Sequence, residues 1–148
     1  MIGNWRACFP VLVQVTSLEQ AKSALADGAL GLIAKGQESG GLIGEESSFI
    51  LLQRILELAA DRKVPVWCQG GIGLHTAAGV IAGGAFGVVL DSQMALLAEC
   101  SLPEEIKSDI ASMDGSETRL LGGYGVYSRP GLAVAEYTEL SAPEARQL

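Results

Sequence analysis

Two polar segments, each directly after an apolar run, have the composition of an anion-binding site. One is Gln69-Gly70-Gly71-Ile72-Gly73 and the other is Asp91-Ser92-Gln93. A glycine-rich turn between a strand and a helix presents backbone N–H groups at the positive end of the helix dipole, where a phosphate binds well. Two such turns on neighbouring strands predict the phosphate site that many (β/α)8 barrels build from their last two loops. The alternative is that these glycines only permit close packing or left-handed turns.

The elements that would position these turns alternate along the chain. Four apolar runs rich in Val and Ile predict strands over 11–15, 30–34, 64–68 and 86–90. None of the runs alternates cleanly with polar residues, which is typical of parallel strands covered on both faces. Helical patterns begin after Ser17, at Ser47 or Ser48, at Thr76, near Ser92 (running to about Glu99) and at Pro103. This order predicts an α/β fold, either doubly wound or a (β/α)8 barrel.

The composition argues against several classes of function. The 148 residues carry a net charge of −7, and the 10 basic residues are scattered, so we expect no nucleic-acid surface. No apolar run reaches the roughly 18 residues that a membrane span needs, so we expect no membrane insertion. An odd number of cysteines favours reduced thiols and a cytoplasmic location. One histidine and no paired cysteine spacing predict no metal site.

Three segments, in order, resemble the nitronate monooxygenase family, also called 2-nitropropane dioxygenases. They are GLIAKGQESGGLIGEES (31–47), PVWCQGGIG (65–73) and GGAFGVVLDSQMALLAE (83–99). The chain is most similar to the nitronate-monooxygenase-like or enoyl-reductase-like domains of polyketide and polyunsaturated-fatty-acid synthases. The resemblance implies an FMN-binding (β/α)8 (TIM) barrel, of which this chain would hold the C-terminal half, with strands like the fifth to the eighth. We therefore predict a partial barrel over 1–112 and an irregular C-terminal tail over 113–148, with at most a short strand near 124–127.

The resemblance also implies the site residues. It places the flavin phosphate on Gly70, Gly71 and the Asp91-Ser92 turn, and the flavin ring or substrate near Lys35, Glu38, Gly40, Gly41 and Gln69. In nitronate-oxidising members a histidine follows the Gly-Gly pair and acts as the catalytic base, whereas this chain has Leu42, which cannot take a proton. The catalytic residues are therefore unknown, with Lys35 and Glu38 as candidates. The alternatives are a solvated or salt-bridged lysine and a surface acid.

Two residues near these segments are predicted to have no chemical role. Cys68 lies within an apolar run and is interpreted as a core residue, because no cation that would stabilise a thiolate is nearby in the sequence. His75 follows the glycine turn and is interpreted as an exposed residue at a helix start, where the helix dipole disfavours an imidazolium. The alternative for His75 is a contact with a phosphate or a substrate.

Two functions of different classes remain open, with a weaker third. The first is an FMN-dependent oxidoreductase module resembling nitronate monooxygenase or enoyl reductase, active in its parent protein but not as the isolated chain. The second is a non-catalytic remnant or structural module of a multidomain polyketide or fatty-acid synthase. The third is a barrel fragment that binds a sugar phosphate. Because half a barrel has two unpaired sheet edges and an open apolar interior, we expect the N-terminal half-barrel or another copy of the chain as a partner, besides a small-molecule substrate.

Overall fold

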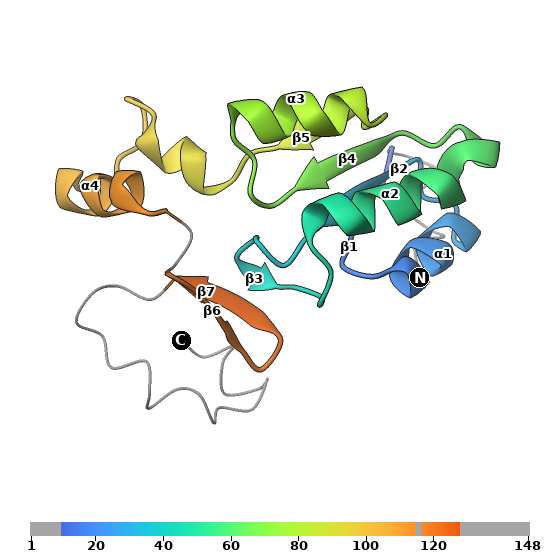
Figure 1. Ribbon diagram of the computed structural model, residues 1–148, viewed down its shortest axis with the longest axis horizontal. Coiled ribbons are helices and arrows are strands. Elements are labelled where there is room, and N and C mark those ends of the chain that lie inside the picture. The colour runs from blue at the N-terminus through green and yellow to red at the C-terminus, as the bar shows by residue number, and fades with distance from the viewer. Residues whose placement is uncertain (1–9, 115–116, 128–148) are drawn as a thin grey trace. The chain divides into compact units, whose positions relative to one another are not determined.

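The computed structural model describes residues 10–114 and 117–127 of the chain, which forms two compact units (Figure 1). The first unit is Met1–Val89 and the second is Leu90–Leu148. Within the described residues, no helix is long and apolar enough to cross a membrane, and no group of three or more metal-ligating side chains is present.

The first unit contains a four-stranded parallel sheet in the order β1-β2-β4-β5. Its strands are β1 (Leu12–Val15), β2 (Gly31–Lys35), β4 (Val66–Gln69) and β5 (Gly87–Val89), and a two-residue strand, β3 (Gly41–Leu42), lies in the loop after β2. Its helices are α1 (Leu18–Ala26), α2 (Ser48–Ala59) and α3 (Leu74–Ala82), with a 3-10 turn η1 (Ala60–Arg62) after α2. All four predicted strands are present, which confirms the α/β fold.

Serine side chains fix where the first two helices begin. The Ser17 hydroxyl accepts a hydrogen bond from the Gln20 backbone N–H at 3.3 Å, and the Ser47 hydroxyl accepts one from Ile50 at 3.4 Å. Both serines have extended backbones, as N-cap residues do. The Gln20 side chain accepts a hydrogen bond from the Thr16 backbone N–H instead of from the N-cap residue itself. The predicted starts of α1 and α2 are therefore confirmed.

The two faces of the sheet differ in what packs on them. In register, Leu12 lies opposite Gly31, Ile33 opposite Trp67, and Lys35 opposite Gln69, so these side chains share one face. The alternate strand residues form the core with α1, α2 and α3. We call this second face the covered face; its residues are Val13, Val15, Leu32, Ala34, Val66, Cys68 and Val88. We call the other the open face; its residues are Leu12, Gln14, Gly31, Ile33, Lys35, Trp67, Gln69, Gly87 and Val89.

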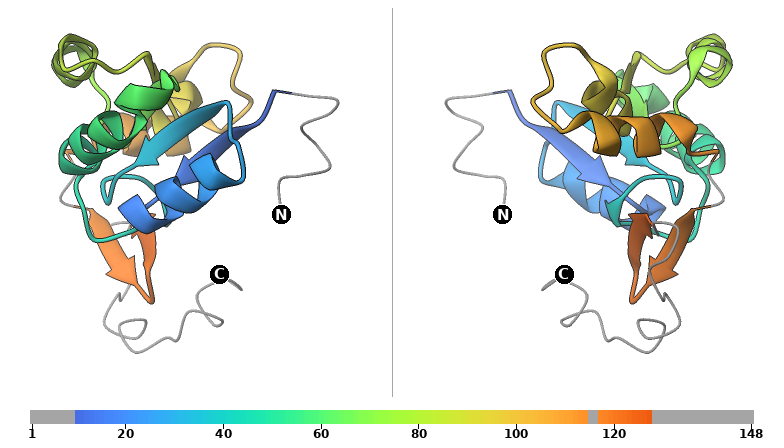
Figure 2. Two further views of the ribbon diagram at one scale, coloured as in Figure 1. Left: turned by 90° about the vertical axis from the view of Figure 1, so that its right-hand side faces the viewer. Right: turned by 90° about the vertical axis from the view of Figure 1, so that its left-hand side faces the viewer.

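The helices lie against the covered face because their apolar side chains match it. Leu51, Leu52 and Ile55 of α2 are almost fully buried and pack in the same cluster as Val15 and Leu32. Figure 2 shows β1 and β2 side by side, with α1 close to β1. The core of the first unit is thus a single layer between the helices and one side of the sheet.

The second unit has a 3-10 helix, an α-helix and a hairpin. These are η2 (Ser92–Leu96), α4 (Glu104–Ser112), β6 (Thr118–Leu121) and β7 (Tyr124–Tyr127), and the last two strands pair antiparallel. The predicted helix from Ser92 to about Glu99 is wrong, since only a 3-10 turn forms and Leu97 is extended. No residue of η2 is buried, and a helix without a buried apolar face has little to stabilise it.

The hairpin lies in the segment that was predicted as an irregular tail. The expected short strand is β7, whereas β6 was not anticipated. Gly122 and Gly123, between the strands, have φ of +53° and +84°, the left-handed pair that a tight hairpin turn requires. The Gly-Gly pair was the sequence signal for this hairpin. Residues 115–116 and 128–148 of the predicted tail lie outside the described residues.

Candidate functional site

Polar side chains gather on the open face at the carboxyl ends of the first unit's strands. Lys35 ends β2 and Gln69 ends β4, directly opposite each other, and they are only 7% and 8% exposed. Gln14 of β1 donates a side-chain hydrogen bond to the Gln69 oxygen, reaching across β2. Below these groups on the same face lie the apolar Ile33 and Trp67. A polar layer above an apolar layer is the arrangement of a barrel interior near its binding end.

The loop after β2 closes onto the start of α2. Oε2 of Glu38 accepts a hydrogen bond from the Ser48 backbone N–H at 2.9 Å, which satisfies one of the unpaired amides of the helix N-terminus. A side chain on Gly36 would place its Cβ 2.1 Å from the Ser48 nitrogen, so the chains approach too closely for any residue but glycine. Glu38 is half-buried and acts structurally here, a role that neither sequence hypothesis for it included.

The same loop packs against the glycine turn after β4. Gly70 and Gly71 have φ of +108° and +62°, in the left-handed region that other residues rarely adopt. A Cβ on Gly70 would lie 2.7 Å from Oγ of Ser39, and one on Gly71 would lie 3.5 Å from the Glu38 side chain. Close packing and left-handed turns therefore account for these glycines on their own, and the predicted phosphate contact remains a prediction.

The glycine turn is also held by Thr76, which the sequence analysis named only as a helix start, two residues after the observed start of α3. The Thr76 hydroxyl accepts a hydrogen bond from the Gly73 backbone N–H at 2.7 Å and donates to the Gly71 carbonyl at 2.8 Å. Thr76 lies three residues after the N-cap residue Gly73, which is the spacing of a capping box. His75, next to it, is exposed at the start of α3, as expected.

Ser39 carries a polar atom that the described protein atoms leave unsatisfied. The residue is 1% exposed, and its Oγ has no hydrogen-bond partner among the described residues. The hydroxyl faces the Gly70 position, at the centre of the turn predicted to bind phosphate. A buried hydroxyl without a partner is unfavourable by about 1–3 kcal/mol, so a ligand atom or a water at this place would stabilise it.

The Gly-Gly pair after Ser39 lies beside the buried lysine. Gly40 is half-buried, and Gly41 has φ of +76° with its missing Cβ 3.5 Å from Nζ of Lys35. Leu42, at the position of the family's histidine base, is half exposed and apolar. The carboxyl end of β2 thus has a cation, Lys35, beside the loop, but the loop supplies no proton acceptor at residue 42.

The second predicted turn belongs to the second unit. Asp91 is the N-cap of η2, and its Oδ1 accepts hydrogen bonds from the Ser92 backbone N–H at 2.6 Å and from the Ser92 hydroxyl at 3.3 Å. Asp91 is exposed. Val89 of β5, the last residue of the first unit, lies opposite Gln69 of β4, so β4 and β5 end at the same edge of the sheet. The shared role of the two turns in one phosphate site stays a prediction.

Cys68 is a core residue, as predicted. It is fully buried on the covered face, and its thiol donates a long hydrogen bond of 3.9 Å to the Ser48 carbonyl. Burial raises the pKa of the Cys68 thiol, and the nearby Glu38 carboxylate adds to this, against the smaller lowering effect of the Ser48 contact. A thiol that is buried and kept protonated is a poor nucleophile.

Comparisons with known proteins agree on one family. The sequence model of that family, described as nitronate monooxygenase, matches residues 5–134. FabK from Thermotoga maritima and a point mutant of it superpose with TM-scores of 0.74 and 0.77, at 27% and 25% identity over 93% and 91% of this chain. A nitroalkane oxidase from Streptomyces ansochromogenes superposes with a TM-score of 0.74, at 27% identity over 90% of the chain. No curated protein matches.

The chain spans less than half of each of these structures. It covers 45% of the FabK mutant, 44% of FabK and 42% of the nitroalkane oxidase. Its four parallel strands alternating with helices correspond to about half of the barrels to which they are similar. The predicted fold class, a half of a (β/α)8 barrel, is therefore confirmed.

Proposed function

Because this chain belongs to the nitronate monooxygenase family, we propose that it is a module of an FMN-dependent oxidoreductase, with the flavin phosphate held at the Gly70-Gly71 turn. The observation that carries this proposal is the Ser39 hydroxyl, which is buried without a partner beside that turn. The donor type and the place fit a phosphate oxygen as acceptor.

The open face would position the reactive end of the cofactor. Lys35 brings a positive charge to the strand ends, next to the Gly41 backbone. Gln69 is oriented by the hydrogen bond from Gln14, so its amide is presented in one direction. Bound FMN would supply hydride or electron transfer, while these residues hold and orient it and exclude water. Glu38 contributes indirectly, because it fixes the loop that carries Ser39.

Leu42 favours reductive chemistry over the oxidation of a neutral nitroalkane. Oxidation of a nitroalkane begins with removal of a proton by a base, and a leucine at this position cannot remove one. Reduction of an enoyl thioester adds a hydride to one alkene carbon and a proton, which water can supply, to the other, so it needs no base at residue 42. We therefore propose an enoyl thioester in preference to a neutral nitroalkane as the substrate class.

A second candidate function is a non-catalytic module of a multidomain synthase. Leu42 and the coverage of less than half of the similar structures favour it for the chain by itself. The two candidate functions predict different changes in FMN fluorescence when FMN is added to the chain. A module that has lost its chemistry together with its ligand would leave FMN fluorescence unchanged.

The test is a titration of the purified chain with FMN, in which binding is measured by the quenching of flavin fluorescence. Gly71→Val should abolish binding, because the added side chain projects toward the Glu38 loop from a left-handed backbone. Gly123→Val is the matched control: this residue also has a positive φ, but its missing Cβ points into open space, and FMN affinity should be unchanged. Equal affinity of Gly71→Val and the wild-type chain would contradict the proposed site.

Ser39→Ala separates a ligand role from a structural role. In the absence of FMN its free energy of unfolding should equal or exceed that of the wild type, since an unsatisfied buried hydroxyl is removed. With FMN its affinity should fall by about tenfold, the loss of one hydrogen bond. Where FMN binds, reduction by NADPH and turnover of a nitronate or an enoyl thioester then distinguish the substrates.

A further inference from the structure

The open face carries an apolar surface that the described part of the first unit leaves accessible. Leu12 of β1 is 48% exposed, and Phe86, directly before β5, is 70% exposed. Between them on the sheet lies Trp67 of β4, whose ring meets that of Phe86 edge to face with centroids 5.0 Å apart. Large apolar side chains that are exposed together mark a surface for association.

Glycines on both neighbouring strands make room for the tryptophan. A Cβ on Gly31 of β2 would lie 2.6 Å from Trp67, and a Cβ on Gly87 of β5 would lie 2.7 Å from it. The indole therefore reaches over β2 and β5 and forms a broad apolar surface on the open face. This surface is packed within its own layer but has no second layer above it among residues 10–89.

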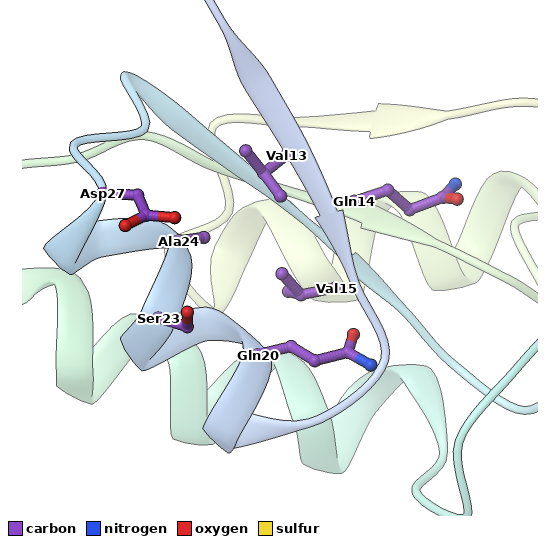
Figure 3. Close-up of a pocket in the computed structure, with 7 residues that line it drawn as sticks. All are labelled: Val13, Gln14, Val15, Gln20, Ser23, Ala24 and Asp27. Atoms are coloured by element: carbon purple, nitrogen blue, oxygen red, sulfur yellow. The ribbon is translucent and has the colours of Figure 1, made fainter. Parts of the chain in front are cut away.

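Both edges of the sheet are also unpaired. Within residues 10–89, β1 and β5 each have a strand neighbour on one side only. Beside β1, a groove of about 260 Å³ separates the strand from α1 (Figure 3). The groove is lined by Val13, Gln14, Val15, Gln20, Ser23, Ala24 and Asp27. Unpaired edges of parallel strands are strong sites for further strand pairing.

We propose that a second copy of this chain covers the open face and pairs with both edges. A two-fold axis that runs along the strands would bring β5 of each copy next to β1 of the other. Because rotation about such an axis preserves strand direction, all eight strands would stay parallel, and two identical seams would close a barrel. Eight is the number of strands at which side chains fill the interior.

The strand count and the distribution of polar residues favour a second copy as the occupant. The chain superposes on 45% of a similar structure, so two copies supply the strands of one barrel. The pairing would place the Leu12, Trp67 and Phe86 surfaces of both copies at one end of the interior. It would place Lys35 and Gln69 of both copies at the other end, so that each copy supplies half of the polar residues at the carboxyl ends of the strands. This inference does not depend on FMN binding.

The first measurement is the mass of the chain in solution. Light scattering after size exclusion should give about twice the 15.4 kDa of one chain. In a Trp5→Phe variant Trp67 is the single tryptophan, and its emission should shift to shorter wavelength as concentration rises through the dissociation constant. A monomer at every concentration, with the Trp67 emission unchanged, overturns the proposal and points to a separate half-barrel or another protein as the occupant.

Matched lysine substitutions test which face associates. Leu12→Lys should produce a folded monomer, because it places a charge on the open face. Ile50→Lys, at a position of similar exposure (52%) on α2, should remain a dimer. Circular dichroism checks that both variants are folded. If Leu12→Lys does not fold, hydrogen exchange of the wild type replaces it: amides of β1 and β5 should gain protection with concentration, and those of α2 should not. Dimers that dissociate with Ile50→Lys, or exchange that is independent of concentration in β1 and β5, overturn the proposal.

Discussion

The covered and open faces of the sheet come from the same strands, yet within residues 10–89 helices pack on one of them only. On the covered face Val15, Leu32 and Cys68 are at most 1% exposed, whereas on the open face Leu12 is 48% exposed. The strand sequences show little of this difference, because the strands are apolar on both faces except for Gln14, Lys35 and Gln69 on the open face. Nearly continuous apolar runs are typical of parallel strands that are buried on both sides. The open face therefore has the composition of a buried surface, and for this reason we expect other protein atoms to pack on it.

Truncation of a leucine should show the largest contrast between the faces. Leu52→Ala removes a side chain that is almost fully buried above the covered face and should lower the free energy of unfolding by about 2–5 kcal/mol. Leu12→Ala, on the open face, should lower it by about 1 kcal/mol or less in the monomer. Urea denaturation at low protein concentration measures both. Equal losses would mean that Leu12 is covered within one chain.

Adding a methyl group to a glycine of the open face tests the packing of Trp67. Gly87→Ala places a carbon 2.7 Å from the indole and should destabilise the first unit by about 1–3 kcal/mol. Combining it with Trp67→Leu should recover part of this loss, since the smaller side chain leaves space. Additive effects in the double-mutant cycle would show that Trp67 does not contact Gly87 in solution.

Removal of the Glu38 carboxylate, which binds the N-terminus of α2, should lower the free energy of unfolding by less than Leu52→Ala or Gly87→Ala does. Glu38→Ala leaves the Ser48 backbone N–H of α2 without its acceptor and should cost about 0.5–2 kcal/mol, as for loss of a helix cap. Glu45→Ala, an exposed acid in the same loop, is the control and should change stability little. If the two variants unfold at the same urea concentration, the contact to Ser48 contributes nothing.

The smallest predicted effect is a pH dependence that arises from Cys68. Burial raises the pKa of this thiol in the folded state above the value of about 8.5 that it has in the unfolded chain. The folded state thus binds the proton more tightly, so this contribution is fully present below about pH 8.5 and is lost as pH rises through the folded pKa. Cys68→Ala should flatten the fall in stability between neutral and alkaline pH. An unchanged slope in Cys68→Ala would contradict this prediction.

Local signals were sufficient for most of the fold. The caps Ser17 and Ser47 are adjacent to the helices that they start, so the sequence contains both partners of each hydrogen bond. The helix expected from Ser92 failed because its stability depends on a buried face, which no local pattern in that segment guarantees. The hairpin strand β6 was missed although Gly122 and Gly123 marked its turn.

The candidate site was predictable only in part. Lys35 and Gln69 were named from the family resemblance, and the structure places them opposite each other at the strand ends, where barrel sites are built. Their role in binding stays a prediction. Gln14, Ser39 and Thr76 were not found, because their contacts are made with residues brought close by folding or by the turn itself. A polar residue inside an apolar run, as Gln14 is, was the one signal that the sequence offered.

The sequence by itself determined the order of the four parallel strands and the helices between them, the starts of α1 and α2, and the family. These depend on residue type and on spacing over a few positions. The tertiary structure decided that Gly70 faces Ser39, that Glu38 binds the N-terminus of α2, and that one face of the sheet has no second layer among residues 10–89. These features depend on which segments meet in space. The sequence alone cannot distinguish a glycine that makes room for a neighbouring loop from a glycine that makes room for a phosphate.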